Sequence, residues 1–488
     1  MKPHWIPRLP PCADRRSCVP LTMKVVLLAL LCVGYQSVAT LLSEEGPSAA
    51  SATVYYVAPT GSNSNPGTED QPWRTIQKAA DTLVAGDTVH IKAGTYQERV
   101  VPQNPGSAGN IIVYTAYPGD TATIDGASIS VPEWGGLFDM SGKSYIRVSG
   151  LRIMNAGPGP HNPGILADGS SHIVIDNNVV SNTSDSGISV WNSEDVTVDN
   201  NEVEGACYGG YNESISVGGT DGFEVKHNHV IHGQKEGICA KDGSRNGKVF
   251  GNRVHDTGAV GIYVDAWDKH TYNIEVFDNL VHDTTAGNGF SLASETGGML
   301  ENIRVYNNIA YHNRYIGLSI SINGPGGPQG EHPMNDIHVV NNTLSDNGWE
   351  TWGGGIAVDN PDAQDVVIRN NIGSQNIYFQ IVVGSAVEAE NVTIDHNLID
   401  GYRGTEGETY GNQYVEGDPM FVYPAGADFH LRQESPAIDQ GSPADAPAMD
   451  FEGHPRPYGA GYDIGADEYT LFTYSVYLPV TVRDHARL

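Results

Sequence analysis

Short alternations of apolar and polar residues recur along the chain from Tyr145 to about Asn397, and most of them end at an asparagine. Clear examples are FEVKHN, KVFGN and IEVFDN, which begin at Phe223, Lys248 and Ile274. Alternation of this kind predicts a β-strand with one face buried. A polar turn follows each strand, and a second short strand then opens at a glycine. The pattern therefore predicts many short strands and little helix.

The asparagines that end these strands recur at intervals of 23 to 34 residues. A period in the twenties with alternating strands predicts a β-solenoid, in which each repeat forms one turn. Stacked asparagine side chains can then hydrogen-bond to one another along the solenoid axis. We therefore interpret this set as scaffold, with Gly150 in the equivalent place before it: Asn178, Asn201, Asn228, Asn252, Asn279, Asn308, Asn342, Asn371 and Asn397.

The two ends of the solenoid have different patterns. Near the N-terminus, a strand at 54–58 precedes a short amphipathic helix with Ile76, Ala79, Ala80 and Leu83 on one face, which would cover the first turn. We expect a presequence at 1–52, a β-helix at 53–415 whose N-terminal cap spans 53–100, a closing segment at 416–469 and a tail at 470–488. The tail sequence SVYLPVTVR is too short to span a bilayer.

The opening stretch from VYYVAPTGSNSNPGTEDQPW to IKAGTYQERV resembles the N-terminal segment of family-nine pectate lyases and other pectin lyase-like β-helix proteins. The resemblance covers about the first fifty residues after the presequence. It implies an all-β fold, a right-handed parallel β-helix with a short N-terminal cap helix and a C-terminal capping segment. It also implies a carbohydrate-active protein.

The N-terminus predicts export. Met23-Lys24 followed by VVLLALLCVG has the basic and apolar regions of a signal peptide, which makes Met23 the expected start. Cys207 and Cys239 are the cysteines that remain after cleavage, so one disulfide at most can form. We expect a secreted protein, free or held at the cell surface, that is monomeric and has no membrane span.

The formal net charge of −31 disfavours nucleic acid as a partner, because binding to phosphates requires lysine and arginine. The same charge would repel an acidic polysaccharide unless cations intervene. Calcium is the expected cofactor, since carboxylates are its preferred ligands.

The glycine-opened strands can be aligned on the apolar residue after the glycine, which faces inward: Ile188, Ile215, Ile238, Ile262, Phe290, Leu318 and Ile356. Three residues further, Lys241 and Asp265 fall in one outward column on neighbouring turns. Two residues before the aligned position, Glu213 and Glu236 stack on neighbouring turns. Carboxylates about 5 Å apart repel unless one is protonated or a cation bridges them. Glu213 and Glu236, with Asp242, are therefore a candidate calcium site.

The motif Glu236-Gly-Ile-Cys-Ala-Lys241 is similar to the Glu-x-Ile-x-x-Lys stretch of the chondroitinase B and alginate lyase family. The resemblance implies that Glu236 binds calcium and that Lys241 is the catalytic base. That family has an arginine where our register places Asp265. The first hypothesis for function is therefore a secreted polysaccharide lyase that cleaves a uronic-acid polysaccharide by calcium-assisted β-elimination.

Two other functions remain open. Asp265 and Glu295 lie about one turn apart, which is close to the carboxyl separation of retaining glycosidases. The stretch Asn252–Trp267 also resembles the β-helix β-xylosidase family. The resemblance implies a nucleophilic aspartate after a similar strand, and the acid/base glutamate of that family would match Ala293 rather than Glu295. The third possibility is a non-catalytic glycan-binding surface solenoid.

Candidate substrate-binding residues are those expected at outward or turn positions next to the carboxylates: Trp191, Tyr263, Trp267 and Asp268. Four histidines share a turn position in the repeat, where we expect them to stack as structural residues: His232, His255, His282 and His312.

Overall fold

The structure is a computed structural model that describes residues 52–327, 329–349 and 352–470. All of these residues belong to one compact unit. The predicted presequence and tail lie outside the described residues, apart from residues 52 and 470. In the described part of the chain, no helix is long and apolar enough to cross a membrane.

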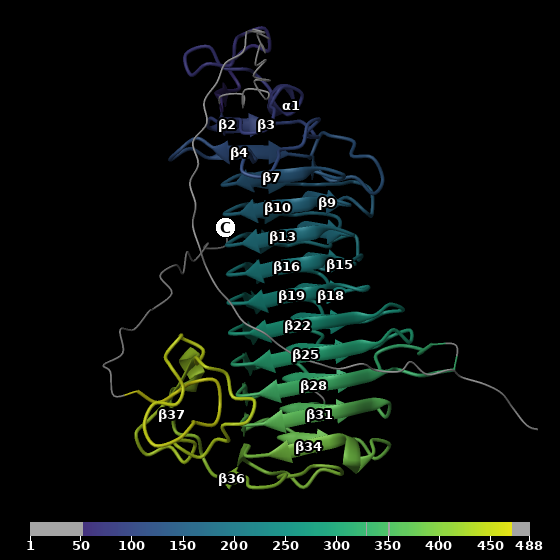
Figure 1. Ribbon diagram of the computed structural model, residues 1–488, viewed down its shortest axis with the longest axis vertical. Coiled ribbons are helices and arrows are strands. Elements are labelled where there is room, and N and C mark those ends of the chain that lie inside the picture. The colour runs from purple at the N-terminus through teal and green to yellow at the C-terminus, as the bar shows by residue number, and fades with distance from the viewer. Residues whose placement is uncertain (1–51, 328, 350–351, 471–488) are drawn as a thin grey trace, which may run out of the picture. The chain divides into compact units, whose positions relative to one another are not determined.

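Three parallel β-sheets run along the solenoid, and each complete turn contributes one strand to each sheet (Figure 1). The first sheet has thirteen strands among the described residues, in this spatial order: β1 (Val54–Val57), β2 (Thr88–Ile91), β4 (Ile112–Ala116), β7 (Ser144–Ser149), β10 (Ser171–Asp176), β13 (Glu194–Asp199), β16 (Asp221–Lys226), β19 (Arg245–Phe250), β22 (Thr271–Phe277), β25 (Leu300–Tyr306), β28 (Met334–Val340), β31 (Ala363–Arg369) and β34 (Val392–Asp395).

The second sheet also has thirteen strands in the described part of the chain: β3 (Gly94–Tyr96), β5 (Ala122–Asp125), β8 (Arg152–Met154), β11 (Val179–Ser181), β14 (Glu202–Glu204), β17 (His229–Ile231), β20 (Arg253–His255), β23 (Leu280–His282), β26 (Ile309–Tyr311), β29 (Thr343–Ser345), β32 (Ile372–Ser374), β35 (Leu398–Asp400) and β36 (Val415–Glu416). The third sheet has ten such strands: β6 (Phe138–Asp139), β9 (Ile165–Asp168), β12 (Ile188–Trp191), β15 (Ile215–Gly218), β18 (Ile238–Lys241), β21 (Ile262–Asp265), β24 (Phe290–Ala293), β27 (Leu318–Ser321), β30 (Ile356–Asp359) and β33 (Ile381–Val383).

The predicted asparagine ladder is present. From Asn178 to Asn397, each side-chain amide donates to the amide oxygen of the next asparagine at 2.9–3.1 Å. The residue before Asn178 in this column is Leu151, whose backbone N–H donates to Asn178, and Gly150 lies one position earlier. A second ladder runs from Asn313 through Asn347 to Asn376. Buried chains of hydrogen bonds of this kind fix the register of the turns that they join.

The histidine column was predicted one residue out of register. Strand pairing aligns His255 with His282 and Tyr311, and their rings stack with centroids 4.6 and 4.7 Å apart. His232 and His312 lie one residue later, in the turns. The structural role expected for the stacked histidines is confirmed for His255 and His282.

The N-terminal cap matches its prediction. Helix α1 (Ile76–Ala80) buries Ile76, Ala79 and Ala80 against the first turn, and Leu83 is buried just after it. Thr75 caps the helix by accepting a hydrogen bond from the Lys78 N–H.

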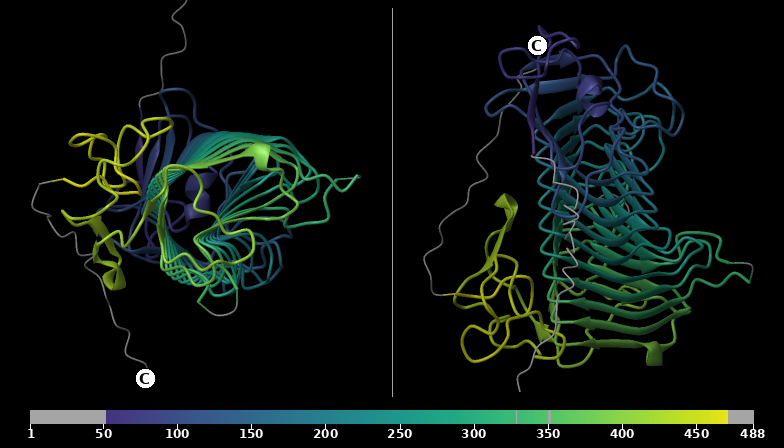
Figure 2. Two further views of the ribbon diagram at one scale, coloured as in Figure 1. Left: turned by 90° about the horizontal axis from the view of Figure 1, so that it is seen from below. Right: turned by 45° about the horizontal axis from the view of Figure 1, so that its top comes forward.

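The segment after Glu416 lies beside the stacked turns, and its strands β37 (Phe421–Tyr423) and β38 (Asp428–Leu431) form a hairpin (Figures 1 and 2). Short 3-10 helices, η1 (Ala389–Asn391) and η2 (Pro424–Gly426), complete the structure. The side chains of Asn307, Asn341 and Asn370 donate to backbone carbonyls of the segment after Glu416 at 2.8–2.9 Å. The segment therefore contacts the flank of the solenoid, where each of these asparagines precedes a ladder asparagine.

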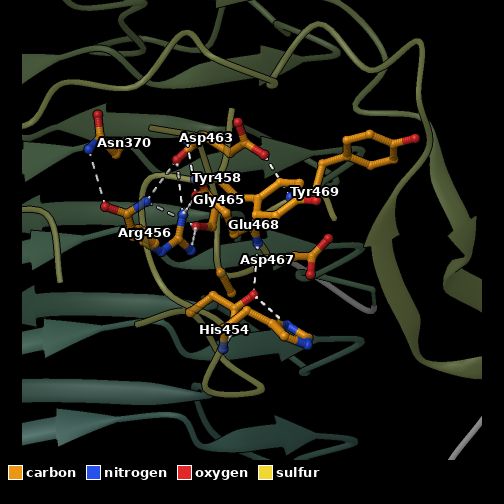
Figure 3. A network of polar contacts seen from close by, with 12 residues as sticks. Asn370, His454, Arg456, Tyr458, Asp463, Gly465, Asp467, Glu468 and Tyr469 are labelled. Atoms are coloured by element: carbon orange, nitrogen blue, oxygen red, sulfur yellow. Dashed lines mark hydrogen bonds and ion pairs between the residues drawn. The ribbon is translucent and has the colours of Figure 1, made fainter. Parts of the chain in front are cut away.

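An enclosed ion pair organises this C-terminal segment (Figure 3). Arg456 and Glu468 are both fully buried, and Arg456 Nη1 lies 2.7 Å from Glu468 Oε2. The other carboxylate oxygen of Glu468 accepts from the Tyr458 N–H at 2.6 Å. Asp463 also accepts backbone N–H groups. Arg456, Glu468 and Asp463 therefore hold the C-terminal segment together.

Candidate functional site

The outer face of the third sheet carries the predicted site residues. Strand pairing aligns the inward residues from Ile188 to Ile356 as predicted. The outward position that follows each of them is covered, being at most 7% exposed at Ser189, Ser216, Cys239, Tyr263, Ser291 and Ser319.

Longer side chains from both edges of the sheet cover these outward positions. Trp191 donates from its indole N–H to Ser189 at 2.9 Å, and Asn288 donates to Ser291 at 3.0 Å. Glu213 accepts from Ser216 at 2.6 Å. The candidate site is therefore a layer of polar side chains laid over the third sheet.

Lys241 and Glu213 form the central ion pair of this layer. Lys241 Nζ lies 2.6 Å from Glu213 Oε1, and both side chains are mostly buried. Burial disfavours the lysine charge, but the Glu213 carboxylate, together with Cys239 and Asp242, outweighs burial and raises the pKa of Lys241. Lys241 is therefore a fixed cation in this arrangement. Its partner is Glu213 and not Asp265, which follows it in the same outward column.

Trp191 lies across the neighbouring strand. A Cβ at Gly218 would be 2.2 Å from the Trp191 ring, so glycine is needed for the ring to lie there. Lys241 Nζ lies 5.4 Å from the centroid of the same ring. Trp191 is half-buried, and its ring contacts the lysine of the ion pair.

Further carboxyl groups lie at both ends of the strands of the third sheet. Burial, followed by the charge of Glu213, raises the pKa of Glu236. Burial also raises the pKa of Asp185, although Asn212 donates to both of its oxygens at 2.9 and 3.0 Å. Burial likewise raises the pKa of Asp242.

The proposed calcium ligands are not gathered in this structure. Two groups of three metal-ligating side chains with atoms within 4.8 Å of one another occur among the described residues, and both lie in the C-terminal segment. Among the described residues, Glu213, Glu236 and Asp242 do not form such a group, and one carboxylate oxygen of Glu213 is ion-paired with Lys241. This donor arrangement does not fit a calcium ion without rearrangement.

Asp265 and Glu295 form a second unit of the site. Asp265 is 2% exposed, and its Oδ1 accepts from the Trp267 N–H at 2.9 Å and the Glu295 N–H at 3.4 Å. Burial raises the pKa of Asp265 to about 7, and the Trp267 N–H opposes that rise. The carboxyl group can therefore keep its proton close to neutral pH.

Tyr263 completes this unit. Its hydroxyl donates a short hydrogen bond to Glu295 Oε1. Tyr263 is 7% exposed, so the prediction that it offers an exposed ring to a substrate is not met. Trp267 is 45% exposed and Asp268 is also exposed, as a sugar-contacting role requires. The Tyr263 hydroxyl was missed because its partner comes from the next turn.

The two cysteines do not pair. Cys207 and Cys239 are both free and buried. Burial raises the pKa of both thiols, which disfavours the reactive thiolate. They are core residues in this fold.

Two cavities lie away from this layer, against the C-terminal segment. One is about 630 Å³ and is lined by Asp278, Tyr306 and Met449, among other residues. The other is about 870 Å³ and includes Asp283, Asp418 and Arg432. Neither includes the predicted site residues. We place the candidate site on the third sheet because paired carboxyl groups, a cation and an exposed tryptophan occur together there.

The three stacked sheets define a parallel β-helix protein. The chain belongs to the family described as Pel9A-like, right handed beta helix region, whose profile matches residues 55–324. The predicted family and its right-handed β-helix are thereby confirmed.

Proteins of similar sequence or similar fold match most of the length of this chain. The protein YwoF of Bacillus subtilis (strain 168) is 29% identical over 453 residues, which cover 82% of this chain and 94% of YwoF. The solved structure of pectate lyase Pel9A has a TM-score of 0.52 at 17% identity, covering 86% of this chain and 97% of Pel9A. The complex of XylC with xylose has a TM-score of 0.55 at 13% identity, covering 85% and 98%. At these identities the two structures share the fold.

Proposed function

We propose that this protein is a secreted enzyme that cleaves a polysaccharide by hydrolysis, with Asp265 and Glu295 as its catalytic pair. The observation that carries the proposal is the buried Asp265 carboxyl group, whose pKa is raised to about 7 one turn away from Glu295. A glycosidase needs one carboxyl group that keeps its proton and one that is ionised.

Asp265 is assigned as the general acid. Both of its backbone hydrogen bonds end on Oδ1, so its Oδ2 is assigned to deliver the proton to the glycosidic oxygen. The bond from the Trp267 N–H holds the carboxyl group in place and fixes the turn that presents the exposed Trp267 ring. A sugar stacked on that ring would lie beside the acid.

Glu295 is assigned as the carboxylate partner. The Tyr263 hydroxyl donates to it, and such a donor stabilises the ionised form. Neighbouring strands are about 4.8 Å apart, which is close to the roughly 5–5.5 Å carboxyl separation of retaining enzymes. Glu295 would therefore attack the anomeric carbon, and water would later release the sugar with Asp265 acting as the base.

A lyase remains a second candidate. Its support is the family membership and the crowding of Glu213 and Glu236, which a calcium ion would relieve. In that reaction Lys241 would remove the proton beside a uronate carboxylate. The ion pair with Glu213 opposes this role, because it keeps Lys241 protonated.

Product analysis distinguishes these candidates. The secreted protein is incubated with xylan, galactomannan, polygalacturonate and alginate, with calcium or with a chelator. New reducing ends that persist with chelator support hydrolysis by Asp265 and Glu295, and Asp265→Asn and Glu295→Gln should abolish them. Calcium-dependent absorbance of an unsaturated uronate, lost in Lys241→Ala, would replace our proposal with the lyase. Binding without either product would favour the non-catalytic solenoid.

A further inference from the structure

Three loops that connect the second sheet to the third carry an exposed aromatic cluster. Trp134 follows β5, His161 follows β8, and Tyr211 follows β14. The Trp134 and His161 rings stack with centroids 3.8 Å apart and planes 6° apart. The Tyr211 ring meets His161 edge-on at 4.5 Å. We call Trp134, His161 and Tyr211 the aromatic platform.

The platform exposes apolar surface that the fold does not use. Trp134 is 65% exposed, the highest value among the large hydrophobic side chains of the described residues, and Tyr211 is 47% exposed. Scattered surface aromatics are ordinary, but a stacked group held by three separate loops is a built surface. The flat faces of pyranose rings pack on such rings through dispersion and apolar contact.

Hydrogen bonds hold one loop of the platform from behind. Asn212 follows Tyr211 and donates to both oxygens of the buried Asp185. Asp185 Oδ2 in turn lies 4.0 Å from His161 Nδ1. The two bonds from Asn212 hold the Tyr211 loop against Asp185, which preorganises the Tyr211 ring for a ligand.

The platform is continuous with the candidate site. Tyr211 lies two residues before Glu213, in the same loop. His161 precedes β9, and Asp265 ends β21, four strand spacings away in the third sheet. Four spacings correspond to about 19 Å along the solenoid. A ligand that reaches both points must therefore be an extended chain of several sugars.

The charges beside the platform select the kind of sugar. Asp185, Glu213 and Glu236 follow one another along the same edge of the third sheet. The two lysines beside them, Lys241 and Lys235, are already paired with Glu213 and Glu236, so neither is free to bind a uronate. Arg99, which lies against the Trp134 loop, is already paired with Asp139 at 2.5 Å. A neutral pyranose needs no cation of its own, so it fits this edge better than a uronate does.

We propose that Trp134, His161 and Tyr211 form a distal subsite that binds a neutral pyranose unit of an extended polysaccharide chain, remote from the cleavage point. The subsite deepens the proposed hydrolytic function and rests on it for the identity of the bound chain. It gives the enzyme a preference for long substrates.

Binding without turnover tests this subsite. In a Glu295→Gln background, affinity electrophoresis compares neutral polymers (xylan, galactomannan and soluble β-glucan) with polygalacturonate and alginate. We expect binding to a neutral polymer, and Trp134→Ala should weaken it about tenfold, as loss of one stacked ring predicts. Trp134→Phe should retain most of the affinity. Tyr423→Ala removes an exposed ring of the C-terminal segment and should change nothing.

Three results would overturn the subsite: unchanged binding in Trp134→Ala with normal melting, a Trp134-dependent preference for the uronate polymers, or no binding to any neutral polymer. Should Trp134→Ala misfold, Tyr211→Ala from a separate loop supplies the same comparison. The proposed hydrolysis is judged by products instead, so reducing ends released from a short aryl glycoside with no platform-dependent binding would remove the subsite alone.

Discussion

Lys241 and Glu213 are joined by a 2.6 Å ion pair between β18 and the loop before β15, and both are largely shielded from water. Removing the lysine leaves Glu213 uncompensated beside Glu236. We expect Lys241→Ala to lower the free energy of unfolding by about 3 kcal/mol, because a buried charge loses its partner. Urea denaturation measures the change.

The matched control for this ion pair is Lys248→Ala. Lys248 Nζ lies 3.5 Å from Glu275, with both side chains about half exposed, so its loss should cost less than about 1 kcal/mol. Equal destabilisation by the two variants would mean that the Lys241–Glu213 pair is solvated in the native protein.

The raised pKa of Asp265 predicts a pH-dependent stability. The folded protein keeps the Asp265 proton up to pH about 7, whereas the unfolded chain releases it near 3.8. The stability that the folded protein gains by holding the Asp265 proton is therefore fully present below pH 3.8 and is lost as pH rises through 7. The free energy of unfolding of Asp265→Asn minus that of the native chain should be larger at pH 8 than at pH 4, by at most about 4 kcal/mol.

Melting curves of both proteins at several pH values measure this difference. Asp359→Asn, at the exposed end of the same column, controls for the loss of any carboxyl group. A stability difference between Asp265→Asn and the native chain that stays constant from pH 4 to 8 would contradict the raised pKa.

Activity should follow the same ionisation in the hydrolytic proposal. If Asp265 is the acid, kcat/KM falls as pH rises above about 7, since the proton donor is lost. Tyr263→Phe removes the hydrogen bond to Glu295 and should lower kcat about tenfold while the alkaline limb persists. A rate that rises steadily above pH 8 would instead indicate a lysine base.

The asparagine ladder should be a main source of stability. Asn279 donates to the Val249 carbonyl and to Asn308, each at 2.9 Å, and accepts from Asn252. Asn279→Ala leaves several buried groups without partners, so we expect a loss of about 3 kcal/mol. Asn335→Ala, which removes one 3.4 Å side-chain contact on β28, should cost well under 1 kcal/mol in the same urea titration.

Much of the fold was predictable because the repeat is local in sequence. Ladder asparagines are separated by one turn, and strands that alternate strictly allow one register for a buried face. Two predictions slipped by one residue for a local reason. Gly150, His232 and His312 lie in turns where the backbone φ is positive. Glycine, asparagine and histidine can all occupy such positions, so the residue type alone did not show which turn position each one holds.

The site was less predictable because it depends on side-chain reach. The outward column containing Asp265 was identified, but its burial depends on neighbours from other turns. The partner of Lys241 is 28 residues away, and the pairing follows the length of the two side chains along the sheet face. The aromatic platform combines three loops whose residues share no repeat position, and no pattern in the chain links them.

The stacking of whole turns has a consequence for substrate length. Distances between points on the third sheet change only in steps of one strand spacing, about 4.8 Å. Insertion or deletion of one complete repeat between β9 and β21 would therefore keep the ladder intact while moving Trp134 relative to Asp265 by one step. The number of turns between the platform and Asp265 would therefore set the length of sugar chain that spans both. Gain or loss of one repeat would change that length while leaving both ends unaltered.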